Sequence, residues 1–223
     1  MGARVALHLL ARGSSGGGGD GDPGAGGGEA AGARRWRGAV VVSGTPGIPD
    51  AEQRADRAAR DAELSEAMRR QGLASFVDWW YRQPLWASLR AHPRFAETSA
   101  RRAAGGDAAE LAAALAGMST GRMAPLWPRL PRLRAPLLLV AGELDPKFLA
   151  IHRRMLAQLT AAAPGGGGGV GGGDAAAQAA RPAHRLLEVP NCGHALHVEA
   201  PLQLLAAVRG FLASLEQERP PAA

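Results

Sequence analysis

Three short apolar runs alternate with longer stretches of helical spacing along this chain. The runs cover residues 39–44, 131–141 and 184–189, and they are rich in Val and Leu. Apolar runs of this length, bounded by turn residues, are typical of strands that are buried on both faces. Strands that alternate with helices predict a parallel sheet with helices packed on it, so the expected fold class is α/β.

The stretches between these runs repeat apolar residues with the period of a helix. The shorter ones predict helices over residues 3–12, 147–162 and 201–215. Residues 50–118 keep the same spacing throughout, and three residues interrupt it, namely Gly72, Pro84 and Pro93. A helical region of this length between two strands predicts a cap that lies over the sheet.

Two low-complexity segments, residues 14–32 and 164–182, are rich in Gly and Ala. Such sequence cannot bury enough apolar surface to order itself, so both segments are predicted to be disordered inserts. The expected organisation has three parts. They are residues 1–49 with a helix, the first insert and the first strand, residues 50–130 as the cap, and residues 131–217 as the remaining core with the second insert.

The formal net charge of +6 changes this picture little. Almost all basic residues are Arg, with Lys147 as the single lysine, and they are scattered among acidic residues on helical segments. No basic cluster interleaves with stacking aromatics, so the charge indicates a compositional bias and not a nucleic-acid interface. No apolar run approaches the roughly 20 residues that a membrane-spanning helix needs. We therefore expect neither a nucleic-acid partner nor a membrane span.

Two polar residues follow the second and third predicted strands. Asp145 comes shortly after the second run, and His194 follows the third run in a Gly-His step. The carboxyl ends of parallel strands meet at one edge of a sheet, so the two loops are expected to emerge together. In serine-type chemistry a histidine takes the hydroxyl proton while a carboxylate orients its imidazole. Asp145 and His194 are therefore the expected catalytic pair, with a helix cap and a loop histidine as the simpler alternatives.

The nucleophile that would complete this pair is missing. Residues 1–7 read like the segment that follows a serine at a strand-to-helix elbow, so the serine itself would precede the first residue. Ser14 lies in a glycine-rich insert and Ser43 follows a strand without an elbow, so neither is a good replacement. Cys192 lies two residues before His194, and we expect a partly buried loop residue rather than a thiol nucleophile.

Five segments of the chain resemble the 2-succinyl-6-hydroxy-2,4-cyclohexadiene-1-carboxylate synthase family. They are residues 1–7, 43–47, 78–89, 142–148 and 193–199. The Gly-His step is common to the α/β-hydrolase superfamily, whereas the Trp-Tyr-x-Gln-Pro and Glu-x-Asp-x-Lys-Phe runs are more particular. The resemblance covers nearly the whole chain outside the two inserts. It implies the C-terminal part of an α/β-hydrolase fold, with three parallel strands, flanking helices and a helical cap.

This resemblance implies a lyase of menaquinone and phylloquinone biosynthesis. A triad-activated serine would remove a proton so that pyruvate leaves and the cyclohexadiene forms, and no metal or organic cofactor is implied. In plants and algae the family forms the C-terminal part of a multifunctional plastid protein, which favours a chloroplast location with the cytoplasm as the alternative. The implied substrate carries several carboxylates, for which arginines are suitable bidentate partners.

Seven residues match positions from which the family would bind its substrate. They are Arg4, Arg54, Arg57, Trp80, Tyr81, Trp86 and Lys147. The alternative for Arg4 is a solvated helix arginine, and for Arg54 and Arg57 it is a surface ion pair. Ordinary cap packing is the alternative for the aromatics, and chance for the lysine.

The family's first five strands, its serine and one oxyanion loop have no counterpart here. We therefore expect a C-terminal fragment that is inactive without the missing N-terminal half of the same fold, which is its expected partner. A start codon assigned to an internal methionine would account for this. Two alternatives are a fragment of a generic α/β-hydrolase, either an esterase or a carbon–carbon hydrolase, and a non-catalytic scaffold module.

Overall fold

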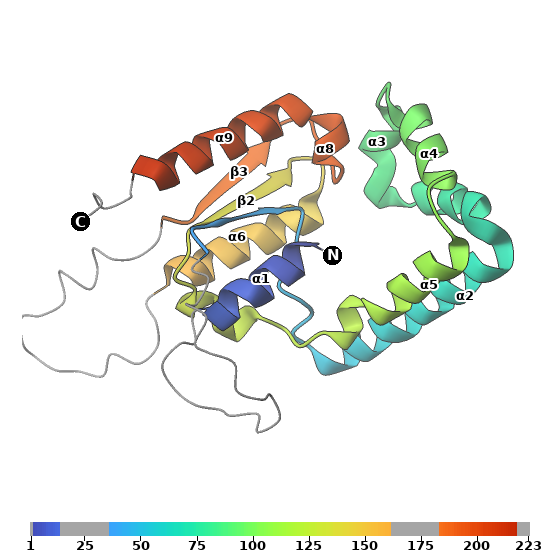
Figure 1. Cartoon of the computed structure of the whole chain (residues 1–223), viewed down its shortest axis with the longest axis horizontal. Coiled ribbons are helices and arrows are strands. Elements are labelled where there is room, and N and C mark those ends of the chain that lie inside the picture. The colour runs from blue at the N-terminus through green and yellow to red at the C-terminus, as the bar shows by residue number, and fades with distance from the viewer. Residues whose placement is uncertain (1, 14–35, 162–182, 218–223) are drawn as a thin grey trace, which may run out of the picture.

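The computed structural model describes residues 2–13, 36–161 and 183–217 (Figure 1). The first residue and both predicted glycine-rich inserts lie outside these ranges. None of the described helices is both long enough and apolar enough to cross a membrane.

A three-stranded parallel sheet forms the centre of the molecule. Its strands are β1 (Ala39–Val42), β2 (Leu137–Gly142) and β3 (Arg185–Val189), in the order β1-β2-β3. The register places Val41 beside Leu139, and Leu139 beside Leu186. Every residue of β2 is buried because helices cover both faces of the sheet, which is why this strand is a continuous apolar run. The predicted α/β class is confirmed.

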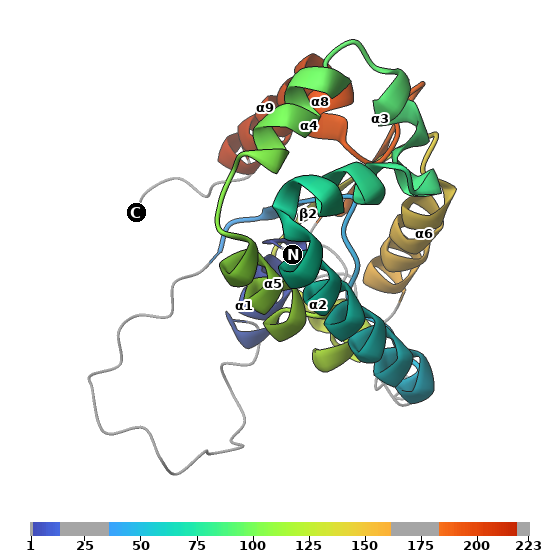
Figure 2. The same ribbon diagram turned by 90° about the vertical axis from the view of Figure 1, so that its right-hand side faces the viewer.

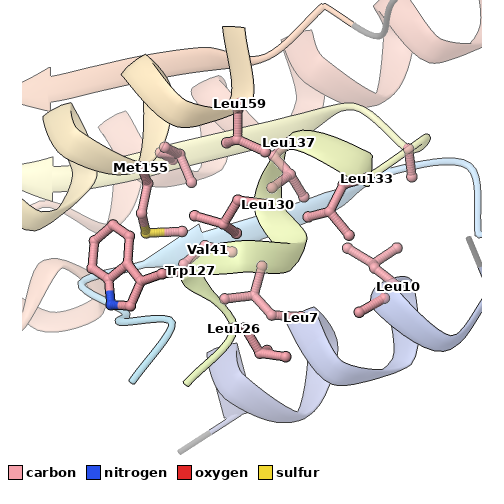
Figure 3. Close-up of a cluster of buried hydrophobic side chains, with 13 residues drawn as sticks. Leu7, Leu10, Val41, Leu126, Trp127, Leu130, Leu133, Leu137, Met155 and Leu159 are labelled. Carbon is pink, nitrogen blue, oxygen red and sulfur yellow. The ribbon is translucent and has the colours of Figure 1, made fainter. Parts of the chain in front are cut away.

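One face of the sheet packs against α1 (Gly2–Gly13), α6 (Pro146–Thr160) and the 3₁₀ helix η3 (Trp127–Arg132). Leu7 of α1, Leu130 of η3 and Met155 of α6 meet Val41 of β1 and Leu137 of β2 in this cluster, which Figure 3 shows. The second strand begins at residue 137 and not at 131, because residues 127–132 form η3 and contribute its apolar side chains to this same core.

The other face of the sheet packs against α9 (Pro201–Gln217). Phe211 is buried there against Leu138 and Val140 of β2 and Val189 of β3. Alternate residues of β2 thus point to opposite faces, and each face has its own helical layer, as Figure 1 shows.

The cap lies beyond the carboxyl ends of the strands (Figures 1 and 2). Its helices are α2 (Ala51–Tyr81), η1 (Pro84–Trp86), α3 (Ala87–Ala91), α4 (Phe95–Ala103), α5 (Ala108–Gly117) and η2 (Thr120–Arg122). The expected interruptions are present: Gly72 has a left-handed φ of 78° inside α2, Pro84 opens η1, and Pro93 separates α3 from α4. A single residue kinks α2 rather than ending it, so the helix continues on both sides.

Candidate active site

Asp145 is held in place by the helix that it begins. It lies three residues after the end of β2 and is the N-cap of α6, where its Oδ1 accepts a hydrogen bond from the backbone N–H of Phe148 at 3.2 Å. The side chain sits at the carboxyl end of the sheet and the residue is only 3% exposed. One carboxylate oxygen is thus used locally, and the other points toward the loop that follows β3.

His194 lies on that loop, before the short helix α8 (Leu196–Glu199). Its Nδ1 is 2.6 Å from Oδ2 of Asp145, and 19% of its side chain is exposed. A carboxylate can only accept here, so Nδ1 is the donor, and in a neutral imidazole the lone pair is then on Nε2. This is the tautomer that a general base needs. The structure therefore brings together the two residues that the sequence predicts as a pair.

Two aromatic rings hold the imidazole between core and cap. Phe148 of α6 has its ring centroid 4.6 Å from that of His194, and Trp86 of η1 lies edge-on at 5.2 Å. The ring centroid of Trp86 also lies 5.4 Å from that of Tyr81 and 6.1 Å from that of Trp80. The three predicted cap aromatics therefore form one connected group, and one of its members touches the imidazole.

A cavity of about 530 Å³ lies inside the cap, between α2, α4 and α5. Trp80 and Tyr81 line it together with apolar residues, and Arg101 and Arg102 stand in its wall. Neither of these guanidinium groups forms a salt bridge with any described residue. Burial, and then the positive charge of Arg102, lower the pKa of His197 on α8.

Arg4 is buried between α1 and the cap. It donates from Nη2 to the backbone oxygen of Met118 at 2.9 Å and from Nη1 to that of Ser119 at 3.5 Å. Its pKa is lowered, first by burial and then by the charge of Arg57. Because α1 begins at the carboxyl edge of the sheet, Arg4 ties that edge to the segment that follows α5.

Arg57 belongs to the same polar group. Its Nε donates to Oδ1 of Asp61 at 2.8 Å, and Oδ2 of Asp61 accepts from the Ser119 hydroxyl at 2.7 Å. Arg54, one turn earlier, donates to the backbone oxygens of Ile48 at 3.0 Å and Pro49 at 2.7 Å. The predicted substrate arginines thus have protein partners, although Arg54 and Arg57 each use only part of their five donors for them.

Lys147, by contrast, is exposed. Its Nζ lies 5.7 Å from the ring centroid of Phe148, which itself packs on His194. The ring of Phe148 therefore lies between the single lysine and the imidazole.

The thiol of Cys192 fits the expected structural role. The side chain is buried, and burial followed by the charge of Glu199 raises its pKa to about 11. It stays protonated at neutral pH and is a poor nucleophile. Among the described residues, no three His, Cys, Asp or Glu side chains gather in a way that could hold a metal ion.

Sequence reasoning did not single out Phe148, Arg101 or Arg102. Phe148 was within reach, because a residue three positions after an N-cap acid lies on the first turn beside it. The two arginines gave no signal in a chain where Arg is common throughout, and only the fold places them in the wall of the cavity.

No protein-family model matches the chain. It is 33% identical over 215 residues to the Arabidopsis thaliana "Protein PHYLLO, chloroplastic", a match that covers 95% of this chain and 10% of that protein. A "Putative 2-succinyl-6-hydroxy-2,4-cyclohexadiene-1-carboxylate synthase" of Bacillus subtilis is 33% identical over 180 residues, which is 79% of this chain and 57% of that protein. The synthase of Serratia proteamaculans is 34% identical over 179 residues, with coverages of 80% and 59%.

A solved structure, "Structure of MenH from S. aureus", supports the fold. It superposes with a TM-score of 0.67 at 24% identity, over 81% of this chain and 60% of that one. The chain thus spans somewhat more than half the length of the bacterial proteins that it matches. Together with the segments that carry the resemblance, these relatives show that the chain has the α/β-hydrolase fold and belongs to the 2-succinyl-6-hydroxy-2,4-cyclohexadiene-1-carboxylate synthase family.

Proposed function

We propose that this chain supplies the acid and the histidine of a 2-succinyl-6-hydroxy-2,4-cyclohexadiene-1-carboxylate synthase in menaquinone or phylloquinone biosynthesis. The observation that carries the proposal is the 2.6 Å contact between Asp145 and His194 at the edge of the sheet that faces the cap. In this lyase a base removes a substrate proton, a carbon–oxygen bond breaks, and pyruvate leaves.

The hydroxyl that works with His194 would enter just before α1. The start of α1 lies against the loop that follows β1, since a Cβ on Gly44 would come within 2.5 Å of the Ala3 side chain. A serine directly ahead of α1 would therefore stand at the same edge of the sheet as His194. His194 Nε2 would then take its proton, while Asp145 stabilises the imidazolium that forms.

The proposed partner is the N-terminal half of the same fold. Among the described strands β1 is at the edge of the sheet, and its outer side has no neighbour. Exposed apolar residues lie on both helical layers nearby: Val5 and Leu9 on α1, and Leu205 and Leu212 on the side of α9 that faces away from β3. A free strand edge flanked by apolar helix surfaces suits a further strand with its own helices.

The proposed substrate is a small polycarboxylate. It would approach His194 through the cap, past Trp80, Tyr81 and Trp86, which offer an apolar wall for a ring. Arg4, Arg54, Arg57 and Lys147 are proposed to supply the positive charge for its carboxylates, through the guanidinium donors that their protein partners leave free and the lysine ammonium. Arg101 and Arg102, which form no salt bridge with a described residue, would add positive charge beside the substrate.

We also propose a plastid location, because the Arabidopsis relative is described as chloroplastic. The bacterial relatives leave the cytoplasm as the alternative.

The test is pyruvate release by the chain extended through the reading frame upstream of its first codon. His194→Ala and Asp145→Asn should each lower kcat by roughly 10³-fold or more, because members of a triad act as a unit. Arg153→Ala, which removes an exposed ion pair with Glu188, is the matched control. Near-normal turnover in either site variant would refute the assignment. Ester hydrolysis without pyruvate release would indicate a generic hydrolase, and the absence of both would favour a scaffold.

A further inference from the structure

The carboxylate of Glu199 accepts hydrogen bonds from the backbone on both sides of His194. Its Oε2 accepts from the N–H of Gly193 at 2.9 Å, and its Oε1 accepts from the N–H of Ala195 at 3.0 Å. Both hydrogen bonds involve an ionised acceptor, which makes them stronger than bonds between neutral groups. A single side chain thus binds the backbone N–H groups of the residues before and after His194.

Without Glu199 these two N–H groups would lack a partner in the fold. Ala195 is the N-cap of α8 and has no side chain that could cap it, and the first amides of a helix have no intrahelical acceptor. Glu199 is the last residue of the same four-residue helix and reaches back to its start. Water cannot easily replace it at Gly193, because that residue is buried.

The cap packs against Gly193 from the other side. A Cβ on Gly193 would lie 1.9 Å from Oγ of Ser88 on α3 and 3.1 Å from Oε2 of Glu199. On the core side, a Cβ on Gly142 would lie 2.2 Å from the carbonyl oxygen of Cys192. The loop that carries His194 is therefore held between the end of β2, the cap and the carboxylate.

We propose that Glu199 is the positioning residue for His194. It sets the backbone on either side of the imidazole so that Nδ1 meets Asp145 and Nε2 is turned toward the cap. The inference deepens the proposed function and rests on it only for the catalytic consequence. The effect of Glu199 on the position of the imidazole does not depend on the proposed function and can be measured on this chain alone.

The test compares Glu199→Ala and Glu199→Gln with the wild-type chain, and uses Glu188→Ala as a control that removes an exposed carboxylate elsewhere. Hydrogen exchange of the Gly193 and Ala195 amides should accelerate about 10- to 100-fold in Glu199→Ala, because each loses a charge-assisted bond. The downfield Nδ1–H resonance of His194 should broaden or shift. Glu199→Gln keeps one acceptor oxygen and should protect one amide only, and it supplies the comparison if Glu199→Ala does not fold.

In the extended protein, Glu199→Ala should lower kcat for pyruvate release about 10- to 100-fold and leave KM near its wild-type value, since a positioning residue does not contact substrate. Unchanged amide exchange and an unchanged imidazole resonance in both variants would overturn the proposal. Altered spectra in variants of a protein that releases no pyruvate even as wild type would instead count against the proposed function and leave the positioning role in place.

Discussion

His152 of α6 is hydrogen-bonded to the backbone of Gly44, which lies two residues after the end of β1, where the chain turns toward the cap. The imidazole is fully buried, and its Nε2 lies 3.1 Å from both the nitrogen and the oxygen of Gly44. Burial outweighs this hydrogen bond and the nearby charge of Asp145, and it lowers the pKa of His152 to about 4. The core directly beneath the Asp145–His194 pair therefore contains a histidine that is neutral at physiological pH.

This histidine should make stability depend on pH between about 4 and 6.5. In that window the unfolded chain binds a proton at His152 and the folded chain does not, so the free energy of unfolding falls as the pH is lowered. The contribution that is lost amounts to about 3 kcal/mol at the lower end. Urea unfolding of wild type and His152→Gln at pH 4.5 and pH 7 measures it. The variant removes the titration, so it should lose less stability on acidification, and equal losses would contradict the assignment.

Asp61 and Ser119 form a buried hydrogen bond, so their contributions to the free energy of unfolding should be coupled. Asp61→Ala leaves the Ser119 hydroxyl and the Arg57 guanidinium without their acceptor, and we expect a loss of about 3 kcal/mol in the free energy of unfolding. Ser119→Ala alone should cost about 1 kcal/mol, the usual contribution of one hydrogen bond. In the double variant the two losses should be less than additive by about 1 kcal/mol. Strict additivity in chemical denaturation would mean that the hydrogen bond does not form in solution.

Much of the fold could be predicted because its signals are local. The strands follow from runs of Val and Leu that are buried on both faces, and the kink of α2 follows from one glycine. The pairing of Asp145 with His194 followed from topology, since both residues come after strands whose carboxyl ends share an edge. Element type and sheet direction were therefore enough to find this pair.

The partners of the arginines could not be predicted in the same way. Arg4 finds its acceptors 114 and 115 positions later in the chain, and a guanidinium binds a backbone carbonyl whatever residue carries it. The start of β2 differs from the prediction for a related reason. Residues 133–136, which connect η3 to β2, place Leu133 and Ala135 in the same core as the strand, so burial alone does not mark where the strand begins. Long-range packing decides such cases, and it leaves little trace in local sequence.

Cys192 should resist alkylation while the protein is folded. With a pKa of about 11 the thiol is almost fully protonated at pH 8, whereas an unfolded chain exposes an ordinary cysteine. Iodoacetamide labelling followed by mass spectrometry at pH 8 should be at least about 100-fold slower in buffer than in 8 M urea. The effect has a clear direction: raising the pH toward 11 should speed labelling of the folded protein. Equal rates in buffer and urea at pH 8 would show that the loop opens readily.

Gly193→Ala tests the contact between the cap and the histidine loop. The added Cβ would lie 1.9 Å from Oγ of Ser88, so either the cap or the loop must move, and we expect a loss of about 3 kcal/mol in urea unfolding. The Nδ1–H resonance of His194 should shift in the same variant, because the displaced peptide precedes the imidazole.

Ser88→Gly should recover part of this loss when it is combined with Gly193→Ala. It removes the hydroxyl and the Cβ that the new methyl group meets, while the carboxylate of Glu199 remains 3.1 Å away and keeps the recovery incomplete. Ser88→Gly alone supplies the control, with a cost of about 1 kcal/mol for glycine within α3. A double variant that loses as much stability as the two single variants together, or more, would mean that Ser88 does not confine Gly193. The loop would then be held by Glu199 and the end of β2 alone.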